Sequence, residues 1–336
     1  LLIPSVFFIL EWIKSWMISG FPWLNLGIIF ESLWGLLPII GVSGTSFVIV
    51  LIICAICEKN IFIRSIVPAL FTILLFFGPG HYQQINDENK NLVITVLQPA
   101  NQGLDGLIEL TNNTNSDIVI WPEASAWYTD NVYGIEKRVI GGFFRNNNEK
   151  VFASIIDTST GEGYNKHNLV PFGEFQPFGD LLTGLNKFFN IQNSNISKGR
   201  LVQDKLDWSG LVCWELVFNN TFVERVRGTE FIVHVSNDSW YGSSMPYQHL
   251  KHAKARAVES NKWVVRSTTD GLSQIISPQK EQSSDFLERK EFGAITHTIK
   301  TNKNDTIYLK LGDRPLLILS FLLCFIGYFY RGNNEN

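Results

Sequence analysis

Long apolar runs separated by short polar connections dominate the first 80 residues, and another apolar run lies near the end of the chain. These runs cover residues 1–19, 35–57, 61–79 and 315–330. A helix that crosses a bilayer needs about 20 mostly apolar residues, with a usual range of about 17–25. Three closely spaced runs without a small-residue cleavage site disfavour the alternative of a signal peptide followed by buried core helices. We therefore predict about three transmembrane helices in residues 1–80 and a fourth near the C-terminus.

Between these apolar parts the pattern changes to short β-branched runs separated by polar turns. We predict strands at 92–97, 117–121, 151–156, 210–213, 231–235, 263–268, 273–276, 294–298 and 306–311. Helical periodicity predicts helices at 104–111, 134–145, 217–227 and 246–260. Alternation of strands and helices is typical of a layered α/β domain. The last strands follow one another directly, which indicates hairpins at the edge of a sheet.

The distribution of basic residues predicts the orientation of this α/β domain. The connection Phe21–Trp34 has no basic residue, whereas the next connection contains Lys59 and Arg64 and the tail contains Arg331. Basic residues stay preferentially on the cytoplasmic side of a membrane. The parity of the helices therefore predicts that residues 81–314 lie on the opposite, outer face.

Charge and cysteine content narrow the possible functions. The net charge of −3 gives no reason to expect a polyanionic partner, so we predict no binding of nucleic acid. Cys54, Cys57 and Cys324 fall in apolar runs, where helix packing explains them better than redox or metal chemistry. Cys213 stands alone in the polar part of the chain. It is either a buried side chain that only fills space in the core or a reactive thiol.

Three residues at the ends of predicted strands carry suitable chemistry. Glu123 ends the sequence IVIWPE, Lys166 lies in YNKHNLVPFGEF, and Cys213 lies in SGLVCWELVF. Singly, they are explained as a solvated loop acid, a surface lysine and a buried strand residue. Together they form a nucleophile, a base for its proton and a cation for the oxyanion on an attacked carbonyl. The backbone N–H of Trp214 is a candidate second donor to that oxyanion.

The order of these segments resembles the nitrilase superfamily, and in particular the apolipoprotein N-acyltransferase family. The resemblance rests on WPE, YNKHNLVPFGEF, VCWE, NDSWYG, QHLKHAKARAVE, EWIKSW and GFPW, which are spread over nearly the whole chain. It implies a nitrilase-like αββα sandwich joined to transmembrane α-helices. It also implies a multi-pass protein of the bacterial inner membrane with a periplasmic catalytic domain.

The resemblance further implies an activity. In the family, a Cys takes an acyl chain from a phospholipid as a thioester and passes it to the α-amino group of the diacylglyceryl-cysteine of an apolipoprotein. By motif, Cys213 is the nucleophile, Glu123 the general base and Lys166 the oxyanion stabiliser. Glu174 and Glu215 fall where the family has supporting carboxylates, which we expect to orient Lys166 and the substrate amine. A phospholipid donor, an apolipoprotein acceptor and the membrane are thus the expected partners.

The expected organisation follows from the same motifs. Residues 1–80 form the membrane helices, 81–314 the catalytic domain, and 315–336 the last membrane helix with a short tail. We expect a monomer and no metal or other cofactor. His249 and His252 have a spacing that suits a metal, but no acid or Cys follows at ligand spacing.

The sequence also departs from the family pattern. The family has further membrane helices before EWIKSW, and Leu1 begins inside an apolar run, so the chain is either a fragment or natively short. The stretch between the first strand and WPE is short, and Trp214 stands where Tyr is commoner. Two alternatives remain open, namely a membrane-tethered amidase that uses water as acceptor and a truncated, inactive relative.

Overall fold

The structure is a computed structural model. It describes residues 1–77, 89–129, 133–171, 173–175, 196–204 and 206–334. The predicted boundary at residues 80 and 81 lies outside these ranges. The chain divides into two compact units, which we call the helical unit (residues 1–84, 255–261 and 304–336) and the sheet unit (residues 85–254 and 262–303).

The sheet unit contains two β-sheets. The first has the strand order β11-β1-β2-β3-β4-β5 and the second has the order β10-β9-β8-β7-β6. The strands are β1 Asn91–Gln98, β2 Ile118–Trp127, β3 Val139–Asn147, β4 Lys150–Asp157, β5 Gly163–Asn165, β6 Trp208–Val212, β7 Phe231–Ser236, β8 Val264–Thr268, β9 Ser273–Ile276, β10 Phe286–Leu287 and β11 Gly293–Lys300. Parallel pairs form the centre of each sheet, β1 with β2 and β3 in the first and β6 with β7 and β8 in the second.

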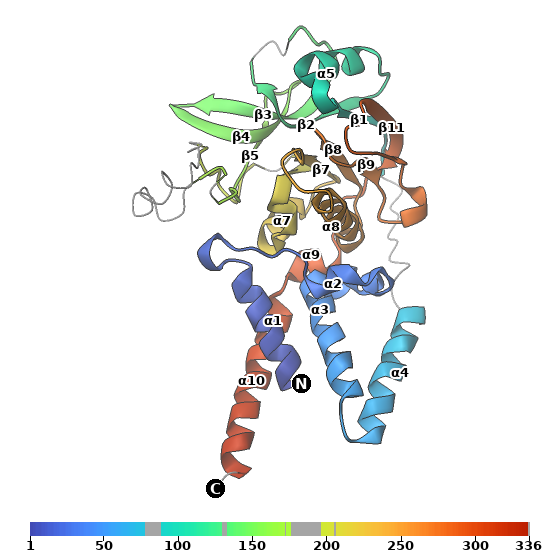
Figure 1. Ribbon diagram of the computed structural model, residues 1–336, viewed down its shortest axis with the longest axis vertical. Helices are drawn as coiled ribbons and strands as arrows, with labels where there is room; N and C mark the ends of the chain where they lie inside the picture. The colour runs from blue at the N-terminus through green and yellow to red at the C-terminus, as the bar shows by residue number, and fades with distance from the viewer. Residues whose placement is uncertain (78–88, 130–132, 172, 176–195, 205, 335–336) are drawn as a thin grey trace. The chain divides into compact units, whose positions relative to one another are not determined.

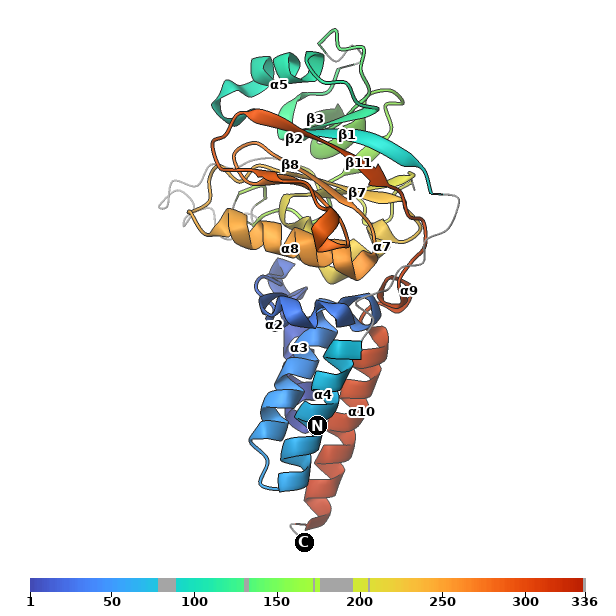
Figure 2. The same cartoon turned by 90° about the vertical axis from the view of Figure 1, so that its right-hand side faces the viewer.

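Helices cover the outer faces of the two sheets. Helix α5 (Gly103–Asn112) covers the first sheet, whereas α7 (Asn219–Val226) and α8 (Met245–Ser260) cover the second (Figures 1 and 2). The inner faces meet where β1 and β2 contact β7 and β8. These four layers are the predicted αββα sandwich, so the predicted fold class is confirmed.

The apolar pattern of the strands explains how α5 is held. Trp121, Val139 and Phe143 are buried in one cluster with Leu107 of α5. The Nε1–H of Trp121 donates to the hydroxyl of Thr111 over 2.9 Å, which satisfies the polar atom of this buried ring. Burying the apolar side of α5 in this way fixes the helix on the sheet.

Two predicted elements are wrong. We predicted a helix at residues 134–145, but the structure has strand β3 at Val139–Asn147. Strand β3 lies between β2 and β4 and pairs with both. We predicted a strand at residues 306–311, but Ile307–Leu311 forms helix α9 because the hydroxyl of Thr306 caps it by accepting the N–H of Leu309. In residues 134–145, pairing with β2 and β4 overrides the helical composition. In residues 306–311, the local cap overrides the β-branched composition.

The helical unit consists of apolar helices. They are α1 Leu2–Lys14, α2 Leu26–Ile29, α3 Leu37–Ile56, α4 Ile61–Phe77, α9 and α10 Arg314–Asn334. Helix α1 contacts α3 and α10, and α3 contacts α4. Within the described residues, one helix is long and apolar enough to cross a membrane, Glu31–Ile56, with a mean hydropathy of 2.6. Two shorter apolar helices cover Ile61–Thr72 and Arg314–Tyr328.

Helix α3 is interrupted at Gly41 and restarted by a carboxylate. Gly41 has a φ of +68°, and a Cβ there would lie 2.3 Å from the ring of Tyr308, so only glycine fits. The Oε1 atom of Glu259 accepts the N–H of Val42 over 2.8 Å, and Arg256 pairs with the same carboxylate. Glu259 thus satisfies a donor that the interruption exposes.

Candidate active site

A buried lysine between two carboxylates forms the centre of the candidate site. The Nζ atom of Lys166 lies 3.1 Å from Oε1 of Glu123 and 2.7 Å from Oε1 of Glu174. The lysine is 0% exposed and each carboxylate is 6% exposed. Each carboxylate also accepts a backbone N–H, that of Asn237 at Glu123 and that of Val170 at Glu174. The three side chains are therefore held in one geometry by ion pairs and backbone donors.

A break in strand β2 places Glu123. The pairing of β2 with β3 shifts register between Trp121 and Ala126, so Glu123 lies within an irregular part of the strand and not just past its end as predicted. Pro122 has no N–H for the ladder. A Cβ on Gly142 of β3 would lie 2.5 Å from the Cα of Glu123, so this glycine lets the backbone of Glu123 approach β3.

Backbone contacts on both sides fix Lys166. It follows β5, its N–H donates to the carbonyl of Ala153 on β4, and its own carbonyl accepts the N–H of Gly199 over 2.7 Å. A Cβ on Gly199 would lie 2.2 Å from the carbonyl oxygen of Asn165. Residue 199 therefore has to be glycine for the loop to pass this close to Lys166.

Cys213 lies in a strained turn at the end of β6. Its φ is +54°, which costs a non-glycine residue about 1–3 kcal/mol and is often found at functional sites. The short 3-10 helix η5 (Cys213–Val217) begins at this residue. The thiol is buried, and its Sγ atom lies 4.0 Å from the hydroxyl of Tyr241. Cys213 therefore lies just outside the regular strand.

Burial and charge set the protonation states at the site. Burial raises the pKa of Glu123, and although Lys166 opposes this shift, the pKa of the carboxyl stays above its ordinary value. Burial lowers the pKa of Lys166, but Glu123 and Glu174 outweigh burial and raise it well above the ordinary value. Burial and then Glu123 raise the pKa of the Cys213 thiol, against the opposing charge of Lys166. The resting site thus combines a charged lysine with a protonated thiol that needs a base.

Glu215 ties the Cys213 turn to the Lys166 loop. Its Oε1 atom accepts the hydroxyl of Tyr164 and the backbone N–H groups of His167 and Asn168, at 2.7, 2.7 and 2.9 Å. Its Oε2 atom accepts the N–H of Val212 over 2.9 Å. The ring nitrogen of the neighbouring Trp214 also donates to the carbonyl of Asn168. Glu215 therefore acts on backbone next to Lys166, whereas Glu174 touches the lysine itself.

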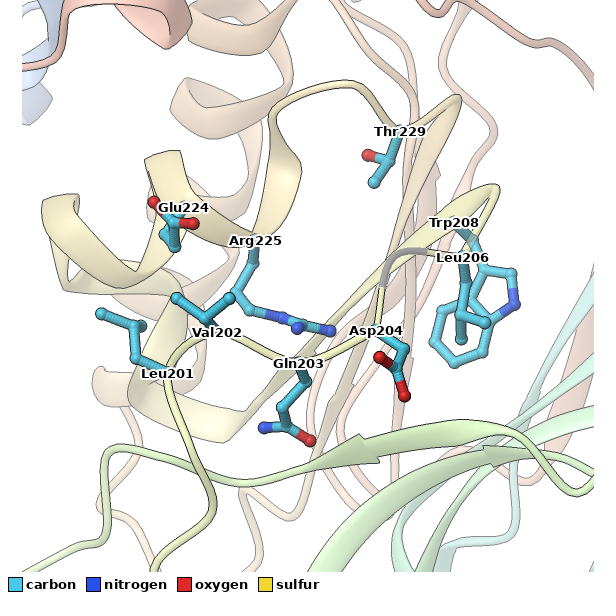
Figure 3. A pocket seen from close by; sticks show the side chains of 9 residues that line it. All are labelled: Leu201, Val202, Gln203, Asp204, Leu206, Trp208, Glu224, Arg225 and Thr229. Atoms are coloured by element: carbon cyan, nitrogen blue, oxygen red, sulfur yellow. The ribbon is translucent and has the colours of Figure 1, made fainter.

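A small pocket lies between α7 and the segment that precedes β6 (Figure 3). Its volume is about 10 Å³, room for roughly one water molecule. Its lining residues are Leu201, Val202, Gln203, Asp204, Leu206, Trp208, Glu224, Arg225 and Thr229. In Figure 3 the side chain of Arg225 extends into it, and the guanidinium carbon lies 3.9 Å from the centroid of the Tyr164 ring. None of the predicted site residues lines this pocket.

Several residues at this site were not predicted from the sequence. His234, Asp238, His249 and Arg266 form a buried polar cluster that reaches the backbone of Cys213. We weighed His249 only as a metal ligand, yet its ring contacts Asp238 and the Cys213 carbonyl. No spacing rule joins these positions, because they come from different strands and from α8. The motifs NDSWYG, which contains Asp238, and QHLKHAKARAVE, which contains His249, were the sequence signals near them.

Comparisons with known proteins agree with the geometry. The family model for carbon-nitrogen hydrolases matches residues 138–303, and that for the N-terminal domain of apolipoprotein N-acyltransferases matches residues 1–55. An apolipoprotein N-acyltransferase from Photobacterium profundum is 30% identical over 94% of this chain and 70% of its own length. One from Wigglesworthia glossinidia brevipalpis is 30% identical over 97% of this chain and 74% of its own length.

Among solved structures, a CN-hydrolase superfamily protein from Xanthomonas campestris is 18% identical. The similarity covers 62% of this chain and 91% of that one, with a TM-score of 0.46, which is too low to bear on the assignment. The assignment rests on the two relatives, each of which matches this chain over more than two thirds of its own length. The chain belongs to the apolipoprotein N-acyltransferase family.

Proposed function

We propose that this protein transfers an acyl chain from a phospholipid to the α-amino group of the diacylglyceryl-cysteine of an apolipoprotein, through a thioester on Cys213. The observation that carries the proposal is the buried cluster of Lys166 between two carboxylates, electrostatically coupled to a cysteine with a φ of +54°. Membership of the family supplies the two substrates. A ping-pong order follows, because the donor product leaves before the acceptor reacts.

In the first half-reaction, Glu123 takes the proton of the Cys213 thiol. The thiolate attacks the ester carbonyl of the phospholipid and forms a C–S bond, and the carbonyl oxygen becomes an oxyanion. Lys166 and the backbone N–H of Trp214 stabilise that oxyanion. The C–O bond to glycerol then breaks, and the lysophospholipid alkoxide leaves with the proton held by Glu123.

In the second half-reaction, the α-amine of the acceptor attacks the thioester. Glu123 takes a proton from the nitrogen, a C–N bond forms, and the same two donors hold the oxyanion. The C–S bond then breaks and Cys213 regains its proton. The raised pKa of Glu123, caused mainly by burial, favours this repeated exchange, since a base with a higher pKa takes protons more readily.

Exposed aromatic rings close in sequence to Glu123 and Asp238 suit an apolar acyl donor. Trp127 follows the irregular part of β2 and is 51% exposed, and Trp240 follows Asp238 and is 59% exposed. Trp240 stacks on Tyr241, with ring centroids 6.0 Å apart, and the hydroxyl of Tyr241 contacts Cys213. We propose that Trp240 and Tyr241 line the approach of the acyl chain to the thiol.

The acceptor test separates a transferase from the amidase alternative. Purified protein, phospholipid and a peptide with an N-terminal diacylglyceryl-cysteine are expected to yield the N-acylated peptide, detected by mass spectrometry. The same peptide with an acetylated amine is the control and is expected to yield none. Release of free fatty acid at the same rate with both peptides would contradict the transferase and favour the amidase.

We also propose a topology for the chain. Residues 1–80 and 315–336 form a multi-pass membrane part of the bacterial inner membrane, and residues 81–314 form a periplasmic catalytic domain of a monomeric enzyme. The basic residues Lys59, Arg64 and Arg331 support this orientation. A reporter fused after Arg331 is expected in the cytoplasm, and one inserted near Asn146 is expected outside. The reverse pattern would overturn the periplasmic assignment.

A further inference from the structure

The carbonyl of Cys213 is held by two histidine rings. The Nε2 atom of His234 lies 2.9 Å from this carbonyl oxygen, and Nε2 of His249 lies 3.2 Å from it. His234 comes from β7 and His249 from α8, and both are 0% exposed. A carbonyl oxygen has two lone pairs and accepts two donors. The backbone of the strained residue is therefore fixed by side chains of two different elements.

The partner of His234 determines its protonation. The Nη1 atom of Arg266 lies 2.9 Å from Nδ1 of His234, and a guanidinium only donates. Nδ1 of His234 is therefore the acceptor, and Nε2 carries the hydrogen that binds the Cys213 carbonyl. Burial and the charge of Arg266 hold the pKa of His234 well below its usual value, so this ring stays neutral. His234 is a permanent donor that does not titrate near neutral pH.

His249 differs because both of its nitrogens face acceptors. Its Nδ1 lies 3.1 Å from Oδ1 of Asp238, and its Nε2 faces the Cys213 carbonyl. Only a doubly protonated ring donates to both. The titratable and charged groups that face His249 are Asp238 from the loop after β7, His234 from β7, Arg266 from β8 and Cys213 from η5.

The charges around His249 make its second proton dependent on pH. Asp238 stays ionised because Arg266 pairs with it over 2.6 Å, and this carboxylate favours the charged ring. Burial and Arg266 act in the opposite sense and lower the pKa of His249. The donor from His249 is therefore complete at low pH and is lost as the pH rises.

We propose that His234 and His249 are positioning residues that hold the left-handed turn of Cys213, His234 at every pH and His249 only when its ring is charged. Because Cys213 is the proposed nucleophile, this role rests on the proposed function. A thiol that is free to leave its turn no longer meets Glu123 and Lys166 in one geometry. Removing His234 leaves the carbonyl of Cys213 with His249, whose donor is lost as the pH rises. Removing His249 leaves it with His234, whose donor does not depend on pH.

The test measures alkylation of Cys213 by iodoacetamide between pH 6 and 9, with the Cys213 peptide followed by mass spectrometry. The readout needs no acyl transfer, so it separates this inference from the proposed function. His234→Leu is expected to raise the alkylation rate about tenfold relative to the wild type, the size of one buried hydrogen bond, because a loosened turn exposes the buried thiol. This gain is expected to grow as the pH rises. His249→Leu is expected to raise the rate less, by a factor that shrinks towards one as the pH rises.

Two further variants distinguish positioning from a general loss of structure. His234→Gln supplies both an amide donor and an acceptor for Arg266, so its alkylation rate is expected to stay close to that of the wild type. His252→Leu, which removes another buried histidine three residues along α8, is expected to leave the rate and its pH profile unchanged. Wild-type alkylation in His234→Leu, or an equal gain in His252→Leu, would overturn the proposal. If the Leu variants do not fold, a tenfold faster alkylation of folded His234→Gln would overturn it as well.

Discussion

The two sides of Cys213 are built from different kinds of contact. Its thiol is close enough to Lys166 and two carboxylates for their charges to act on its pKa, and these are the groups proposed to act in the reaction. Its carbonyl is held by His234, which is neutral, and by His249, which faces Asp238, with Arg266 paired to the same carboxylate. The groups proposed to act in the reaction and the side chains that hold the turn are therefore different residues. Changes on the thiol side should alter rates strongly, and changes on the carbonyl side should alter them through geometry.

Replacing the nucleophile should have the largest effect. Cys213→Ser is expected to lower acyl-enzyme formation by at least about 10⁴-fold, because a hydroxyl is a much weaker nucleophile than a thiol with the same base. Acyl-enzyme formation from labelled phospholipid measures this. Cys57→Ser, at an exposed cysteine of the helical unit, is the control and is expected to react normally. Near wild-type transfer in Cys213→Ser would remove this residue from the mechanism.

Removing the proposed oxyanion donor should have the next largest effect. Lys166→Met is expected to slow thioester formation by about 10²–10³-fold, since its charge acts on the transition state. The exposed Lys150 on β4 provides a control in Lys150→Met, which is expected to retain the wild-type rate. Single-turnover measurements separate the two half-reactions. An unchanged acylation rate in Lys166→Met, with only the second step slowed, would contradict its role.

Glu174 should affect both the rate and its pH dependence. Burial is the main cause of the raised pKa of Glu123, and Glu174 adds to it. The rate should fall as the pH drops through that pKa, because protonated Glu123 accepts no proton. Glu174→Gln removes a neighbouring negative charge, so the acid limb is expected to move to lower pH.

The plateau rate of Glu174→Gln is expected to fall about tenfold, because Lys166 loses one charged partner at 2.7 Å. Rates of acyl-enzyme formation at a series of pH values measure both effects. Glu162→Gln, at an exposed carboxylate of the same unit, is the matched control and should leave the profile unchanged. An acid limb that moves to higher pH in Glu174→Gln would show that the charges around Glu123 are misassigned.

The contact of Cys213 with Tyr241 should matter least. The Sγ to hydroxyl distance is 4.0 Å, the length of a weak contact. Tyr241→Phe is expected to change the acylation rate by only about twofold to threefold. Tyr247→Phe, an exposed tyrosine that bonds to Glu288, serves as the control. A loss of a hundredfold in Tyr241→Phe would make its hydroxyl part of the chemistry on the thiol side.

The residues on the thiol side of Cys213 could be predicted from the sequence, whereas those on the carbonyl side could not. Glu123, Lys166 and Glu174 lie in short motifs with recognisable order, and the structure brings them into direct contact. Their catalytic roles stay predictions. The four layers of the fold were also predicted, because alternating apolar positions report burial directly.

Contacts between residues that are far apart in the chain could not be predicted from the sequence. His234 and Arg266 are 32 positions apart, and only the parallel pairing of β7 with β8 puts them side by side. Strand β3 was missed for a related reason, since its apolar run fits a short helix as well as a strand until β2 and β4 pair with it. The role of Gly142 depends in turn on the irregular course of β2 at Glu123. In each case the structure depends on how strands pair in the folded protein, which the composition of a segment does not determine.

The measurement that tests the central claim most directly is a search for the acyl-enzyme itself. Purified protein is incubated with labelled phospholipid without an acceptor, and the Cys213 peptide is analysed by mass spectrometry. We predict one acyl chain on Cys213, removed by hydroxylamine and discharged by a diacylglyceryl-cysteine peptide, and its absence in Glu123→Gln. An acylated peptide product formed without any adduct on Cys213, or an adduct that the acceptor does not discharge, would contradict the account.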